Sequence, residues 1–137
     1  ADLVNLAHQR DIRVVPLVGP SSILLALMAS GLNGQCFAFQ GYLPIDELAR
    51  KKTLASLEAE SAQRRQTQLF IETPYRNDKL FAALLAQCLP HTQLCVATDL
   101  TLSSERIQTF SIAQWRKTTA PALNKRPSLF LLLAAKK

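Results

Sequence analysis

The residues best suited to chemistry follow an apolar run, in the stretch ETPYR at positions 72–76. Glu72 offers a hydrogen-bond acceptor, Tyr75 offers a stacking surface, and Arg76 offers a clamp for a phosphate or carboxylate. We predict a buried strand over residues 68–72, and open α/β sheets place ligands at the carboxyl ends of such strands. The stretch therefore indicates a binding cleft. The alternative is an ion pair at the strand end followed by the start of a helix.

A second candidate is the stretch RVVPLVGPSS at residues 13–22. Its β-branched first half favours a buried strand over residues 11–17, and its second half favours a sharp turn into a helix. Backbone N–H groups that are free at such a turn can bond a ligand, with no bulky side chain in the way. The alternative is an ordinary strand-to-helix turn. The residues of the turn and of the helix cap are Pro16, Gly19, Pro20, Ser21 and Ser22.

Two further stretches combine turn residues with positive charge. The loop GYLP at residues 41–44, with Tyr42 and Leu43, precedes a polar helix whose two ends are basic. Such cations can contact RNA phosphates, or they can form a solvated face on which glutamates pair with them. The stretch NKRP at residues 124–127 is a basic turn before the last strand. The charged residues of the polar helix are Arg50, Lys51, Lys52, Arg64, Arg65, Glu47, Glu58 and Glu60.

The elements that position these stretches alternate between strands and helices. Helices are predicted over residues 1–9, 22–30 and 46–66, and the second is apolar nearly all round, so we expect other elements to enclose it. Asn77 is the predicted cap of a further helix, and Ser111 caps a short helical turn. The pattern predicts an α/β sandwich with a mixed sheet of about five strands. Strand patterns cover residues 11–17, 35–40, 68–72, 93–97, 106–110 and 128–134, the last with the unbroken apolar run of a central strand.

Composition indicates a single globular domain. The 137 residues are 48% hydrophobic and 19% charged, and no apolar run reaches the ~20 residues that span a membrane. The net charge of +6 favours a polyanionic partner such as RNA, although charge of this size also serves solubility. The cysteines lack metal-ligand spacing and are predicted to be reduced core residues of a cytosolic protein; they are Cys36, Cys88 and Cys95.

Several of these stretches, taken in order, resemble a known family. VVPLVGPSSILLALMASGL, FQGYLP, FIETPYRN and KRPSLFLLLA are similar to the C-terminal half of the tetrapyrrole-methylase-like methyltransferases. These are two-domain α/β enzymes that use S-adenosylmethionine. The nearest branch contains the bacterial small-subunit rRNA ribose methyltransferase and often has Pro-Gly-Pro where this chain has Val18-Gly19-Pro20. Because the Gly-rich loop and Asp-Pro-Gly turn of the family's N-terminal domain are missing, we expect residues 1–137 to be the C-terminal domain, about half of the natural polypeptide.

The resemblance also implies roles for the residues described above. Glu72 is the carboxylate here that can act as base for a ribose hydroxyl, with a base in the absent half as the alternative. The stretch at residues 124–127 is expected to give backbone contacts to the adenine. The implied cofactor contacts are Pro16, Gly19, Pro20, Ser21, Ser22, Thr73, Pro74 and Pro127. The implied substrate contacts are Tyr42, Leu43, Tyr75, Arg76, Arg50, Lys51 and Lys52.

The function implied by the resemblance is methyl transfer from S-adenosylmethionine to a ribose hydroxyl of small-subunit rRNA, in the cytoplasm. Two alternatives stay open: a tetrapyrrole methyltransferase acting on a precorrin-type ring, and a non-catalytic fragment or binding module. The expected partners are rRNA or the small ribosomal subunit, the absent N-terminal domain, and a second copy in a homodimer. No metal and no membrane are expected.

Overall fold

In the computed structural model, which describes residues 1–135, the strand Ser128–Leu133 (β5) lies at the centre of a five-stranded sheet. All of its residues except the last are buried. The central position predicted from its unbroken apolar run is therefore confirmed, because such a run suits a strand covered on both faces. The strand order is β1-β2-β5-β3-β4, with β1 at Phe37–Tyr42, β2 at Thr67–Ile71, β3 at Gln93–Thr98 and β4 at Arg106–Ser111.

The strand directions bring four segments of the chain to one edge of the sheet. β5 is antiparallel to both β2 and β3, while β1 is parallel to β2, so the predicted mixed sheet is confirmed. The carboxyl ends of β1, β2 and β3 therefore lie at the same edge as the amino end of β5. We call this edge, marked by Tyr42, Glu72, Asp99 and Pro127, the carboxyl edge.

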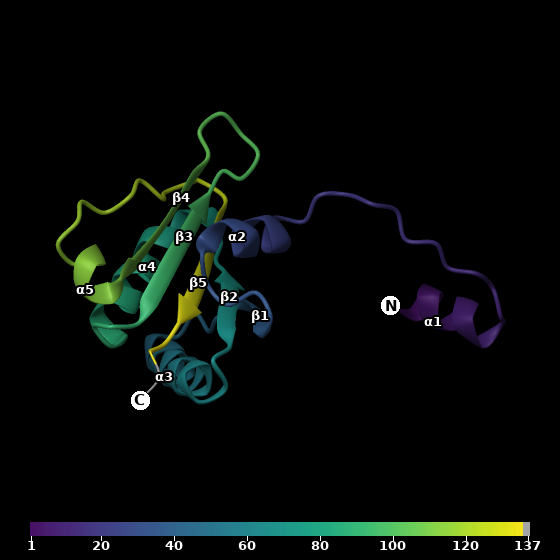
Figure 1. Cartoon of the computed structure of the whole chain (residues 1–137), viewed down its shortest axis with the longest axis horizontal. Coiled ribbons are helices and arrows are strands. Elements are labelled where there is room, and N and C mark those ends of the chain that lie inside the picture. Colours follow the sequence, from purple (N-terminus) through teal and green to yellow (C-terminus); the bar gives the residue numbers. More distant parts are fainter. Residues whose placement is uncertain (136–137) are drawn as a thin grey trace.

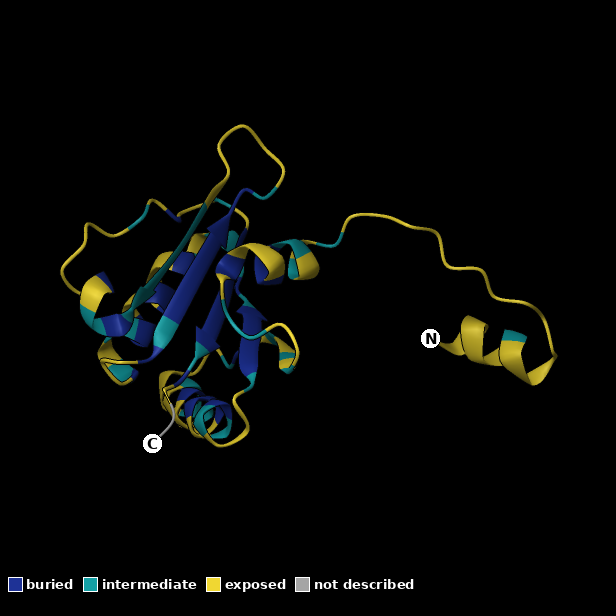
Figure 2. Ribbon diagram, in the orientation of Figure 1, coloured by how far each residue is buried: buried dark blue, intermediate teal, exposed yellow. Residues whose placement is uncertain are grey.

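Three helices cover one face of the sheet (Figure 1). The core beneath them contains the stacked rings of Phe70 and Phe130, whose centroids lie 6.1 Å apart. Trp115 is 1% exposed, and its Nε1 donates a hydrogen bond to the carbonyl of Leu94 at 2.8 Å. Figure 2 shows that the central strands are the most buried part of the chain. The three helices are α3 (Glu47–Arg64), α4 (Asn77–Gln87) and α5 (Ile112–Trp115).

The helix α2 (Ser22–Ser30) covers the other face. It buries Ala26 and Leu27 against the sheet, but Leu24 and Met28 are 49% and 74% exposed. The prediction that other elements enclose this apolar helix is therefore wrong for the described chain, because the sheet contacts only one side of it.

The predicted capping chemistry is found at the starts of α3 and α5. Asp46 accepts a hydrogen bond from the Ala49 N–H at 2.8 Å at the start of α3. Ser111 and Gln114 form a reciprocal capping box at the start of α5. Ser21 stands at the N-cap of α2 without a side-chain hydrogen bond to the helix, so the predicted hydroxyl cap is wrong there.

Residues 1–21, which we call the N-terminal arm, extend away from the sandwich (Figures 1 and 2). The helix α1 (Asp2–Gln9) buries none of its residues, and residues 10–20 are all exposed. Leu17 is 91% exposed and Val18 is 106% exposed. The strand predicted over residues 11–17 is therefore wrong, since a strand forms only where a neighbour bonds its backbone and no described strand lies beside it.

The three cysteines are free thiols in the described chain. Cys88 and Cys95 are buried, as predicted, whereas Cys36 is only half-buried. Burial raises the pKa of Cys88 to about 12, with a further contribution from the nearby negative charge of Glu58. Burial also raises the pKa of Cys95 to about 11. Both buried thiols therefore stay protonated and unreactive at neutral pH.

Candidate functional site at the carboxyl edge

A pocket of about 380 Å³ opens at the carboxyl edge, between the ends of β2 and β3 and the start of β5. Ser22, Pro74 and Pro127 all line it, so three stretches that are far apart in the sequence meet there. Most of the remaining lining residues are apolar, which suits a small-molecule site with a few polar groups. Those remaining residues are Ile71, Glu72, Asp99, Leu100, Leu102, Ser128 and Leu129.

Glu72 is one of two buried carboxylates of this pocket, and only 3% of its side chain is exposed. Its Oε1 accepts hydrogen bonds from the N–H of Thr73 at 2.7 Å and from the hydroxyl of Thr73 at 3.2 Å. Arg76 donates to the same oxygen from Nε at 3.0 Å and from Nη2 at 2.9 Å. These bonds close around the single turn of 3₁₀ helix Pro74–Arg76 (η1), so the carboxylate fixes both the turn and the guanidinium.

The surroundings of Glu72 decide what its carboxylate can do. Burial alone would raise its pKa, but the hydrogen bonds from Thr73 and Arg76, together with the charge of Arg76, hold the pKa below the usual 4.5. A general base works best when its pKa lies near the working pH. The geometry therefore favours a role for Glu72 in anchoring Arg76 and the turn. It favours this role over that of the general base suggested by the sequence.

A second ion pair, which the sequence did not predict, holds the other side of the pocket. Asp99 at the end of β3 accepts hydrogen bonds from Arg126 Nε and from the hydroxyl of Ser104, both at 2.8 Å. These two bonds hold the pKa of Asp99 below its usual value. Arg126 also donates from Nη2 to the carbonyl of Ser104 at 2.8 Å. The loop after β3 is thereby tied to the loop before β5.

Asn77 fixes the same loop from the helix side. It is 0% exposed, and its Nδ2 donates a hydrogen bond to the carbonyl of Arg126 at 2.7 Å. The N–H of Lys125 donates to the carbonyl of Pro74 at 3.1 Å. The prediction that Asn77 caps α4 is wrong, because it is the first residue of that helix and its side chain makes this long-range bond instead. The two segments that carry Pro74 and Pro127 are thus held together.

Beside this pocket lies a groove of about 480 Å³, between the end of β1 and the turn after β2. Tyr42 and Leu43 line one side, and Thr73 and Arg76 line the other. The loop predicted over residues 41–44 is shorter than expected, since β1 continues to Tyr42. The groove therefore joins predicted substrate residues to the predicted cofactor residue Thr73.

Tyr75 does not line this groove. Its side chain is 65% exposed, and the guanidinium carbon of Arg76 lies 5.3 Å from the centre of its ring. That distance is within the range of a cation–π contact. Lys51 and Lys52, which the resemblance implied as substrate contacts, are also exposed and line neither the pocket nor the groove, so this geometry assigns them no contact in the candidate site.

The predicted turn in the N-terminal arm does not reach the pocket in the described chain. Pro16, Gly19 and Pro20 are exposed, and Ser21 is half-buried. A Cβ added at Gly19 would meet nothing within 4 Å, so this arrangement does not require a glycine. Ser22 alone connects the predicted turn to the pocket. The other four residues need a different position of the arm before they can contact a ligand there.

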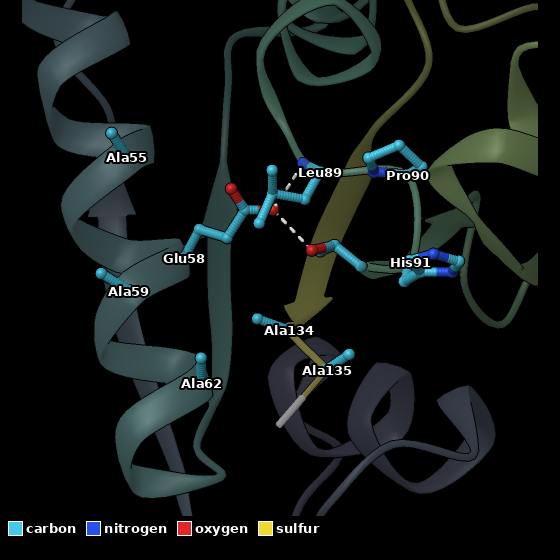
Figure 3. Close-up of a pocket in the computed structure, with 10 residues that line it drawn as sticks. Ala55, Glu58, Ala59, Ala62, Leu89, Pro90, His91, Ala134 and Ala135 are labelled. Atoms are coloured by element: carbon cyan, nitrogen blue, oxygen red, sulfur yellow. Dashed lines mark hydrogen bonds between the residues drawn. The ribbon is translucent and has the colours of Figure 1, made fainter. Parts of the chain in front are cut away.

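A pocket of about 410 Å³ lies at the opposite edge of the sheet, between α3 and the chain before β3 (Figure 3). Glu58 projects from α3 beside it and is 8% exposed, so the alternative of a solvated face does not hold for this glutamate. Its Oε1 accepts hydrogen bonds from the N–H of Leu89 at 2.8 Å and from the hydroxyl of Thr92. Glu58 therefore holds the connection between α4 and β3, far from the carboxyl edge.

Glu58→Ala is expected to lower the free energy of unfolding by about 1.5–3 kcal/mol, the range for hydrogen bonds to a charged group. The loss follows because the Leu89 N–H and the Thr92 hydroxyl keep their positions without an acceptor. Glu60→Ala is the matched control, since Glu60 makes only an exposed ion pair with Arg64 at 3.5 Å. Urea unfolding of both variants measures the difference. Equal losses in the two variants would show that Glu58 does not support the loop.

The described residues offer no metal centre. Within residues 1–135, no three His, Cys, Asp or Glu side chains gather closely enough to hold a metal ion. No helix in this part of the chain is long and apolar enough to cross a membrane. The charged groups of the carboxyl edge are instead engaged in the pairs Glu72–Arg76 and Asp99–Arg126.

Comparison with curated proteins finds relatives along nearly the whole chain. This chain is 33% identical over 131 residues to ribosomal RNA small subunit methyltransferase I of Vibrio cholerae, and the alignment covers 96% of this chain and 44% of the relative. It is 35% identical to the protein of that name from Streptococcus pyogenes, over 82% of this chain and 38% of the relative. The chain thus spans less than half the length of these relatives. No family model matches it.

Solved structures with the same fold include two methyltransferases. The methyltransferase CobJ aligns with a TM-score of 0.56 and 16% identity, over 97% of this chain and 56% of that one. The cobalt precorrin-4 methyltransferase CbiF aligns with a TM-score of 0.53 and 12% identity, over 96% of this chain and 56% of that one. At such identities the likeness concerns the fold alone. The predicted α/β sandwich of this fold is therefore confirmed.

Proposed function

Because this chain belongs to the family of ribosomal RNA small subunit methyltransferase I, we propose that it is the C-terminal domain of a two-domain methyltransferase. The enzyme uses S-adenosylmethionine and methylates a ribose hydroxyl of small-subunit rRNA in the cytoplasm. The observation that supports this most is the meeting of Ser22, Pro74 and Pro127 in one pocket at the carboxyl edge. Open α/β sheets bind their ligands at this position.

The pocket fits part of S-adenosylmethionine. Its volume of about 380 Å³ and its mostly apolar walls suit an adenosine group. The neighbouring backbone of Lys125 and Arg126 is held by hydrogen bonds to Pro74 and Asn77. We assign Ser22, Thr73, Pro74 and Pro127 to this half of the cofactor site. When the N-terminal domain is present, the arm moves against the pocket and completes the cofactor site. The arm residues that join the site are then Pro16, Gly19, Pro20 and Ser21.

When bound, S-adenosylmethionine supplies a methyl group already activated for transfer to a nucleophile. Ser22, Thr73, Pro74 and Pro127 would hold this half of the cofactor. The proton of the ribose hydroxyl would have to pass to a base. This domain contributes alignment in a site shielded from water. Because Glu72 is engaged by Arg76 and Thr73, we place the base in the N-terminal domain and assign Glu72 to positioning.

The substrate side of the site is the groove beside the pocket. Tyr42 and Leu43 offer a stacking and packing surface there, and Arg76 offers a cation next to the cofactor half. Tyr75, outside the groove, is available to a larger substrate such as a folded RNA. The net charge of +6 favours an RNA over a neutral substrate.

The full-length protein is expected to transfer a labelled methyl group from S-adenosylmethionine to the rRNA of small ribosomal subunits. Digestion of the product to nucleosides locates the label on a ribose hydroxyl. A precorrin-type tetrapyrrole serves as the competing substrate in a parallel reaction. Labelling of the ring without labelling of the RNA would overturn the proposed substrate while leaving methyl transfer intact. Labelling of neither would overturn the proposed function.

A further inference from the structure

Three cations line a small pocket next to the groove. This pocket of about 240 Å³ lies between the start of α3 and the start of α4, and Arg50, Arg76 and Lys79 line it. Two carboxylates, Glu47 and Glu72, line it as well. Arg76 and Glu72 belong to the ion pair described above, so this pocket adjoins both the cofactor half and the substrate groove.

The charges in this pocket are not fully paired. Glu72 is matched by Arg76, with the closest atoms 2.9 Å apart. Arg50, by contrast, makes no ion pair with any described residue: its Nη1 donates to the carbonyl of Ile45 at 3.1 Å, and its Nε is buried without an acceptor. Lys79 makes no ion pair with the described residues either and is exposed. The pocket therefore has unused donors on Arg50 and Lys79, and one net positive charge.

We propose that this pocket binds a backbone phosphate of the RNA substrate. The proposal rests on the proposed function, since it names one contact of that same substrate. A phosphate accepts hydrogen bonds from the planar guanidinium of Arg50 and the ammonium of Lys79, which are the usual phosphate ligands in proteins. Because the pocket lies beside the groove, a phosphate bound there fixes the RNA strand whose ribose enters the groove. Phosphate contacts of this kind set register and orientation on a nucleic acid.

The geometry separates Arg50 from the two basic residues that follow it. Successive residues on a helix are rotated by roughly 100° because a turn contains about 3.6 residues. Lys51 and Lys52 therefore leave α3 in other directions, and neither lines this pocket. A uniformly basic helix would make the three residues equivalent. A phosphate site makes Arg50 different from its neighbours.

The experiment compares Arg50→Gln and Lys79→Gln with the matched controls Lys51→Gln and Lys52→Gln in the full-length protein. Binding to deproteinised small-subunit rRNA is measured across a range of KCl concentrations. Arg50→Gln is expected to raise the Kd about tenfold, as for one lost charge-assisted hydrogen bond. The slope of log K against log salt should fall by about 1. Arg50→Lys should recover part of the affinity, and each control should leave both quantities close to wild type.

Each other outcome overturns a definite claim. Equal losses for Arg50→Gln and Lys52→Gln would show a diffuse charged surface in place of a site. Weaker binding of S-adenosylmethionine by Arg50→Gln, with RNA binding unchanged, would assign the pocket to the cofactor carboxylate. Failure of the wild-type protein to bind the rRNA at all would overturn the proposed function, and this site with it. Thermal unfolding of each variant confirms that it is folded before its binding is compared.

Discussion

Glu72→Gln is expected to lower kcat/KM for methylation of rRNA by the full-length protein about 100-fold, as for a displacement of reacting groups by ~1 Å. The amide keeps the size of the carboxylate but removes the charge that Arg76 faces across 2.9 Å. Arg76 then loses the partner that orients it at the border of the groove. Methyl incorporation at several rRNA concentrations gives the two kinetic constants. Glu60→Gln, a change at an exposed glutamate of α3, is the matched control and should have wild-type activity.

The pH profile tests whether Glu72 positions groups or accepts the proton. If it positions Arg76, the profile of Glu72→Gln keeps the wild-type shape at lower amplitude over a range that extends below the usual carboxyl pKa of 4.5, from about pH 3.5 to about pH 9. If it is the base, the variant loses the acidic limb of the profile. A lost limb would contradict the positioning role.

The depressed pKa of Glu72 also has a consequence for stability. A carboxylate whose pKa is lower in the folded state than its usual 4.5 stabilises the fold above that value. The stabilisation is lost as the pH falls through the folded-state pKa. The difference in unfolding free energy between wild type and Glu72→Gln should therefore be constant near neutral pH and shrink in acid.

The isolated chain of 137 residues is expected to bind S-adenosylmethionine at least ~100-fold more weakly than the full-length protein. Such a ratio corresponds to ~2.7 kcal/mol, a modest share of the contacts of a small ligand. The reason is that Pro16, Gly19 and Pro20 are exposed in the arm, while Pro127 lies in the pocket. The two parts of the proposed cofactor site are therefore separate in this chain. Calorimetric titration of both proteins measures the ratio.

A folding control is needed for this comparison, because an unfolded chain would also fail to bind. Circular dichroism and cooperative thermal unfolding of the isolated chain provide it. Addition of the separately produced N-terminal domain should restore binding. Micromolar affinity in the isolated, folded chain would show that the carboxyl edge alone forms the site, and the arm would then have no role in it.

Local sequence patterns predicted the sandwich well. The apolar run at the C-terminal end of the chain identified the central strand β5, because a strand covered on both faces has no polar alternation. Asp46 and Ser111 marked the starts of two helices, since the side chain of each accepts a hydrogen bond from the backbone N–H three positions further along the chain. The arm could not be predicted in the same way. A strand pattern there records a preference for extended backbone, and its pairing depends on a neighbour.

Some of the residues that the sequence proposed for a site lie together at the carboxyl edge, but the connections between them were not predicted. The stretches at residues 72–76 and 124–127 were recognised, and the sheet brings them together. The bond between Asp99 and Arg126, by contrast, joins residues 27 positions apart in two loops. Nothing in either loop indicates its partner. The burial of Glu58 was missed for a similar reason. Its hydrogen-bond donors, Leu89 and Thr92, lie in the loop between α4 and β3, more than 30 positions further along the chain.

The exposed arm also affects how this chain behaves at high concentration. Valine and leucine side chains that stay in solvent on an extended backbone, such as Val15, Leu17 and Val18, are typical of segments that join copies of a protein into aggregates. Pro16 and Pro20 interrupt this segment. A proline has no N–H to donate to a neighbouring strand, so a growing β-stack is broken at each of the two positions. The two prolines that predicted a turn in the sequence therefore protect the exposed arm from self-association.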